Sequence, residues 1–204
     1  MLYHIRRELG KAVIENRGAE EVGVNRDQIA CDVIAFEETL DRGDETDALD
    51  LYRGDLLGSF YIPDAAPKFT QWLDRERERL RLRAAEGAWH LADTAEQTGD
   101  LDAARTWAKH AAGLVPFSDE AQIRLITLLK RIGDRSEALD AYHTFTQRLR
   151  TEWDMEPTDE LKALVDTMTT DGIGLLICTG ALNVRTTDPA PRRGLHAPIH
   201  HRRR

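Results

Sequence analysis

A ten-residue pattern that occurs three times constrains this chain more than any other feature of its sequence. Residues 43–52, 99–108 and 133–142 align without gaps, and the first and third copies are nearly identical. Each copy begins with Gly-Asp and has an alanine five residues after the glycine. Glycine can end a helix in the left-handed conformation, and the following Asp can cap the next helix. The small alanine suits a place where two antiparallel helices approach closely. The pattern therefore predicts helical hairpins.

The spacing of the copies indicates how the hairpins are arranged. The second and third copies are 34 residues apart, which is the period of tetratricopeptide repeats. Pro116 follows the second helix of the middle copy, where it would stop that helix. Glu137 lies three residues after Asp134, the spacing of a capping box. We therefore expect an all-α fold of stacked, tetratricopeptide-like helical hairpins in three units.

Hydrophobic periodicity places the individual elements. Helices are expected at residues 32–42, 46–53, 67 to about 95, 101–114, 119–131, 135–151 and 159–169. Along the long helix one face is expected to be buried, and it carries Phe69, Trp72, Leu73, Leu80, Ala84, Ala88, Leu91 and Ala95. The alternating charges of residues 75–79 are interpreted as a solvated face. Before the array, residues 2–9 have a helical pattern and residues 13–24 resemble a β-hairpin with its turn near Gly18.

Charge is distributed unevenly along the chain, whose net charge is -8. After Thr179 there are six arginines and one acid, Asp188, so the remainder is more acidic than the whole. An acidic body repels the phosphate backbone of DNA at long range, so any contact with DNA must be local. Residues 170–204 have no periodicity, and a disordered basic tail is expected there. Without a secretory signal, a bilayer-spanning apolar run or a cysteine motif, the chain is expected to be cytoplasmic and free of membrane contact.

Several stretches together resemble a known family. They are residues 32–36, residues 48–57 with Leu-Tyr-Arg-Gly-Asp, the charged helix start at 72–77, the repeat copy at 133–142, and Glu-Pro-Thr at 156–158. Residues 32–169 resemble the bacterial transcriptional activator domain of SARP-type antibiotic-regulatory activators. The resemblance implies a transcription regulator whose helical array contacts protein partners, such as RNA polymerase subunits or another regulator. The resemblance is compatible with a homodimer.

In that family a winged-helix DNA-binding domain precedes the helical array. Residues 1–31 resemble only its end, the tail of the recognition helix followed by the wing. DNA binding is therefore expected only if the rest of the winged-helix domain is present. The candidate DNA-contacting residues are His4, Arg6, Arg7, Lys11 and Arg17. The large side chains Tyr52, Trp89, Trp107 and Tyr142 are candidates for lining a partner groove, although most large aromatic residues of such arrays pack between helices.

No motif for catalysis or cofactor binding accompanies these features, so we expect no enzyme activity and no cofactor. His196, His200 and His201 lie in the tail without a further ligand, and no metal site is expected there. The alternative to a DNA-binding activator is a stand-alone, tetratricopeptide-like interaction scaffold, or a truncated remnant, without DNA binding.

Overall fold

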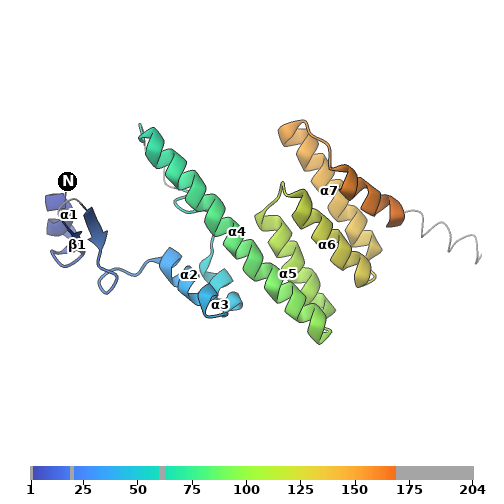
Figure 1. The fold of residues 1–204 in the computed structure, drawn as a ribbon, viewed down its shortest axis with the longest axis horizontal. Coiled ribbons are helices and arrows are strands. Elements are labelled where there is room, and N and C mark those ends of the chain that lie inside the picture. The colour runs from blue at the N-terminus through green and yellow to red at the C-terminus, as the bar shows by residue number, and fades with distance from the viewer. Residues whose placement is uncertain (1, 19–20, 60–62, 169–204) are drawn as a thin grey trace, which may run out of the picture.

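The computed structural model describes residues 2–18, 21–59 and 63–168, and most of these residues are helical (Figure 1). The N-terminal unit consists of α1 (Leu2–Leu9), β1 (Ile14–Arg17) and β2 (Glu21–Val24). The helical array that follows consists of α2 (Asp32–Asp41), α3 (Glu45–Leu51), α4 (Pro67–Thr98), α5 (Leu101–Leu114), α6 (Asp119–Arg131) and α7 (Arg135–Trp153). Residues 159–168 are also helical. The expected all-α, tetratricopeptide-like fold with a small N-terminal hairpin is confirmed.

The three repeat copies form the turns of three helical hairpins, α2–α3, α4–α5 and α6–α7. Their glycines have φ angles of 83°, 80° and 84°, in the left-handed region where a side chain would be strained. The alanines five residues later are completely buried: Ala48, Ala104 and Ala138. The predicted role of the glycine and alanine positions is confirmed in every copy.

The aspartates of the repeat behave differently from one another. Asp100 accepts a hydrogen bond from the backbone N–H of Ala103, and Asp134 accepts one from that of Glu137. Asp44 makes no such cap, because its carboxylate lies 3.3 Å from Nε of Arg42 instead. The expected cap is therefore wrong at Asp44. The capping box is only half formed, since the Asp134 N–H donates to the backbone carbonyl oxygen of Leu129 and not to the Glu137 carboxylate.

The long helix α4 connects the first hairpin to the rest of the array (Figure 1). Proline 67 occupies its first turn, and Gly99 ends it in a left-handed conformation. The α2–α3 hairpin packs so closely on its middle that a Cβ at Gly87 would lie 3.0 Å from Cδ2 of Leu40. Most of the expected apolar face is buried, but Trp72 is 42% exposed, so its predicted burial is wrong. It lies on the second turn of α4, before the residues that contact α2 and α3.

One hydrophobic core runs through the hairpins and ends at the last described helix. Its largest fully buried side chains are Phe145, Ile126, Leu128, Leu129 and Leu161. Leu161 belongs to residues 159–168, which therefore cover the apolar face that α6 and α7 leave open. This arrangement fits repeat proteins, in which a terminal helix shields the last unit from water.

The N-terminal unit stands at one end of the molecule (Figure 1). In its β-hairpin Ile14 pairs with Val24, and Nη2 of Arg6 lies 2.9 Å from Oδ1 of Asn16. Among the described residues, every hydrogen bond and ion pair of residues 2–30 stays within that segment. The unit is therefore held together locally and is not bonded to the helical array.

Candidate partner-binding site

The loop after α3 is fastened to α4 by arginine side chains. Nη2 of Arg81 donates to both carboxylate oxygens of Asp55, at 2.9 and 2.8 Å, and Arg77 donates to the backbone carbonyl oxygens of Leu56 and Leu57. Hydrogen bonds between charged groups are stronger than those between neutral groups. This loop contains the Leu-Tyr-Arg-Gly-Asp stretch, whose backbone therefore has a defined position on the array.

These contacts change the interpretation of the charged run at residues 75–79. Arg79 pairs with Glu37 on α2 and with Glu76 one turn before it. Arg77 is three-quarters buried and reaches the loop. The run was expected to be a solvated face, and this is wrong for Arg77, which is mostly buried against the loop. Arg79 is exposed as expected, but it also joins α4 to α2. The alternation of charges did not distinguish these cross-links from pairs within one helix.

Tyr52 lies beside the Arg81–Asp55 pair in a small hollow of about 240 Å³ between α2, the loop and α4. Its hydroxyl lies 3.5 Å from Oδ1 of Asp55, and its ring lies 5.5 Å from that of Phe36. Burial raises the pKa of the Tyr52 hydroxyl, the Asp55 charge raises it further, and Arg81 opposes both effects. The hydroxyl is therefore held in its protonated form.

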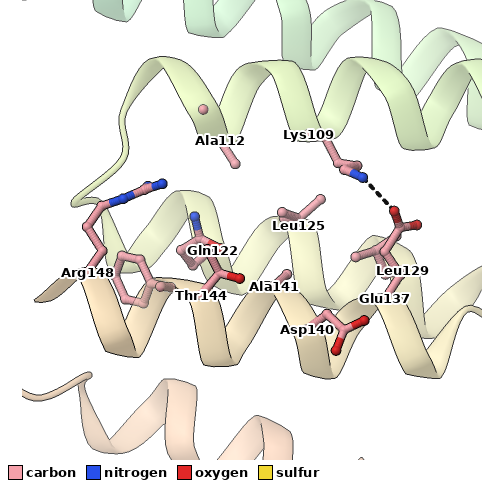
Figure 2. A pocket seen from close by; sticks show the side chains of 12 residues that line it. Lys109, Ala112, Gln122, Leu125, Leu129, Glu137, Asp140, Ala141, Thr144 and Arg148 are labelled. Atoms are coloured by element: carbon pink, nitrogen blue, oxygen red, sulfur yellow. Dashed lines mark hydrogen bonds and ion pairs between the residues drawn. The ribbon is translucent and has the colours of Figure 1, made fainter.

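A larger hollow, of about 410 Å³, opens between α5, α6 and α7 and is named here the α5–α7 hollow. Figure 2 shows its lining side chains, which come from all three helices. Its floor is apolar and is formed by Ala112, Leu125, Leu129, Ala141 and Phe145. Polar and charged side chains surround this floor: Lys109, Gln122, Glu137, Asp140, Thr144 and Arg148.

The two ends of the α5–α7 hollow differ in charge (Figure 2). At one end Lys109 Nζ lies 2.6 Å from Oε1 of Glu137, and Arg105 lies 3.1 Å from the other oxygen of the same carboxylate. Asp140, at that end, has no ion-pair partner among the described residues. Arg148 marks the opposite end and donates a long hydrogen bond, of 3.4 Å, to the carbonyl oxygen of Pro116. A floor that is apolar between an anionic and a cationic end is suited to binding a polypeptide segment.

A comparison with models of protein families matches residues 31–168 to the family described as bacterial transcriptional activator domain. The chain belongs to this family. The matched range contains the whole helical array of the activator domain, including the loop after α3 and the α5–α7 hollow, whereas α1 and the β-hairpin precede it. A comparison with curated proteins found no match.

The four predicted groove residues of the activator domain are not brought together. Tyr52 lines the smaller hollow. Trp89 is buried in the core, and the guanidinium carbon of Arg124 lies 4.4 Å from its ring centre. Trp107 and Tyr142 are half-buried and pack against the core. None of the four lines the α5–α7 hollow, whose residues are mostly small, aliphatic or charged and had no distinguishing pattern in the sequence.

Three of the predicted DNA-contacting residues do share a surface. Arg6, Arg7 and Lys11, together with Tyr3, line one concave face beside α1. The side chain of Arg7 also pairs with Glu8. The ring of His4 contacts that of Tyr3 instead. Arg17 lies at the end of β1, where its backbone pairs with Glu21.

Two further expectations concern metals and membranes. No cluster of three or more potential metal ligands occurs among the described residues, and the tail histidines 196, 200 and 201 lie outside them. Within the described ranges, none of the helices of the activator domain has the length and apolar character that crossing a bilayer requires.

Proposed function

We propose that this chain is the partner-contacting part of a SARP-like transcription activator, and that the α5–α7 hollow is its contact surface for RNA polymerase subunits or another regulator. The family match over the helical array carries this proposal. The hollow supports it, since it is an open concavity with an apolar floor and a charged rim. Interfaces commonly combine a buried apolar centre with a polar rim and use arginine and phenylalanine as anchors.

A tethering assay tests this function separately from DNA binding by the chain itself. The full chain is fused to a heterologous sequence-specific DNA-binding domain, and transcription is measured from a reporter with the matching operator. We expect activation by the fusion. Ala141→Trp, which fills the hollow, should reduce activation at least about fivefold, whereas Ala141→Ser should preserve it. Equal expression and helical circular dichroism of both variants are the controls. A fusion that never activates, or that tolerates Ala141→Trp, would refute the proposal.

We further propose that α1 and the hairpin are the DNA-facing element of the activator. Arg6, Arg7 and Lys11 line one face, where cations can contact phosphates and contribute salt-dependent affinity. The alternative is an interaction scaffold without DNA binding, and it is favoured by the acidic charge of most of the chain and by the isolation of the N-terminal unit. An electrophoretic mobility shift at low salt distinguishes the two. Binding that is lost in Arg6→Ala/Arg7→Ala supports the first, and no binding to any tested promoter DNA supports the second.

A further inference from the structure

The side-chain amide of a glutamine in the α5–α7 hollow has no hydrogen-bond partner among the described residues, and its atoms open onto the hollow. Gln122 on α6 is only 6% exposed, and its side chain lines the hollow between α5 and α7 (Figure 2). No described residue accepts from or donates to its side-chain amide. A polar group that opens onto a hollow without a partner in its own chain is free to bond a ligand. An amide that offers both a donor and an acceptor matches the N–H and C=O groups of a peptide backbone.

A second observation comes from the side of α7 that borders the hollow. Asp140, Thr144 and Arg148 follow each other at intervals of four residues, so they lie on one side of the helix. Two helical turns separate the backbone positions of Asp140 and Arg148 by about 12 Å. In an extended chain, residues four apart are separated by about 13 Å and point to the same side. The residue midway between them also points to that side.

We propose that the α5–α7 hollow binds an extended segment of a partner protein that carries a cation and an anion four residues apart, with an apolar residue midway between them. The cation pairs with Asp140 and the anion with Arg148. The apolar side chain enters between Ala141 and Leu125, and the Gln122 amide bonds the backbone of the segment. The inference rests on the proposed function, because it assigns the partner chemistry of the same hollow.

The glutamine favours an extended segment over a helical one. Inside an α-helix the backbone N–H and C=O groups are already bonded to one another, so a helical partner would leave the Gln122 amide unsatisfied. An extended segment has free backbone groups at each residue. Two of the lining residues, Gly113 and Ala141, are small and leave room for a backbone to approach.

Nuclear magnetic resonance of the ¹⁵N-labelled full chain tests the inference with a defined probe. The probe is the capped heptapeptide Gly-Lys-Ser-Leu-Ser-Glu-Gly. We expect saturable shifts of the Gln122 side-chain amide and of the backbone amides between Asp140 and Arg148. Gln122→Leu should weaken binding about tenfold. Gln147→Leu, on the exposed part of α7, is the matched control and should leave binding unchanged.

A charge exchange identifies the contacts at the two ends. Arg148→Glu makes both ends of the hollow acidic, so it should weaken the first probe about tenfold and create binding of Gly-Lys-Ser-Leu-Ser-Lys-Gly. The inference is overturned if neither probe shifts the hollow at millimolar concentration, or if Arg148→Glu does not change the preference. It is also overturned if a helical peptide with its charges seven residues apart binds more tightly.

Among the chain's own segments with opposite charges four residues apart, Asp188–Arg192 follows the last described helix in the sequence. If the probe binds only after Asp188→Asn and Arg192→Gln are introduced, the occupant is the chain itself and the partner assignment is overturned. The tethering assay keeps the two proposals distinct. If activation depends on Ala141 but neither probe binds, only the inferred ligand class is refuted. If a probe binds but the fusion does not activate transcription, only the proposed transcriptional function is refuted.

Discussion

Arg81 on α4 donates two hydrogen bonds from its Nη2 to the carboxylate of Asp55, across 26 residues of sequence. This pair fixes the loop after α3 against the long helix, together with Arg77 and the carbonyl oxygens of Leu56 and Leu57. The first hairpin is thereby connected to the rest of the array by polar contacts as well as by the core. The Leu-Tyr-Arg-Gly-Asp stretch, one of those that resemble the family, thus has a structural role, since its Asp55 provides this connection.

Loss of the Arg81 guanidinium should measurably destabilise the array. Both partners are about one-third exposed, so solvent screens the pair, and we expect Arg81→Ala to lower the free energy of unfolding by about 1 kcal/mol. Arg75→Ala is the matched control, because Arg75 is exposed on the same helix and has no partner among the described residues. Urea denaturation measures both. Equal stability of the two variants would mean that the pair contributes nothing.

Two glycines should respond to alanine in opposite directions. Gly133 has a φ of 84°, so Gly133→Ala strains the turn between α6 and α7 and should cost about 1 kcal/mol of stability. Gly113 lies within α5 and has nothing within 4 Å of a Cβ, so Gly113→Ala should stabilise the chain by about 0.5–1 kcal/mol through helix propensity. Thermal melts of the two variants check the signs. Shifts in the same direction would contradict this account.

The close approach of the helices at Ala138 should not tolerate a larger side chain. Ala138 is completely buried, and Ala138→Leu should destabilise the chain by about 1–3 kcal/mol through overpacking. Ser136→Leu, two residues earlier on an exposed position, should change stability by less than about 0.5 kcal/mol. Chemical denaturation compares them. An unchanged midpoint for Ala138→Leu would contradict the hairpin packing.

The elements that could be predicted from sequence are those with local causes. The turns at Gly43, Gly99 and Gly133 follow from the conformational freedom of glycine, and the helix bounds follow from the caps and periodicity. Local rules failed where a side chain had a better partner elsewhere. Asp44 pairs with Arg42 and does not cap, and Glu137 pairs with Lys109 and Arg105 and does not complete a capping box.

The α5–α7 hollow could not be predicted, for a different reason. Its lining comes from three helices, and the absence of a large side chain at Ala112, Gly113 and Ala141 is as important as what is present. In the sequence, an alanine that faces a neighbouring helix has the same pattern as an alanine that faces a hollow. The large aromatic residues were a natural prediction for a groove, but Trp89 contributes to the core. The candidate partner contacts could therefore be identified only from the arrangement of the three helices in the structure.

Stability at alkaline pH should depend on Tyr52. Burial and the Asp55 charge raise the folded-state pKa of its hydroxyl above the ordinary value of 10.0, so folding favours the protonated form. The corresponding stability is fully present below pH 10 and is lost as the pH rises through the folded-state pKa. Tyr52→Phe removes this titration, and its free energy of unfolding should fall less steeply above pH 10 than that of the parent chain. Asp55→Asn, which removes only the second cause, should give an intermediate slope. Urea denaturation between pH 8 and 11 measures these slopes, and parallel curves for the parent chain and Tyr52→Phe would show that the hydroxyl is not perturbed by folding.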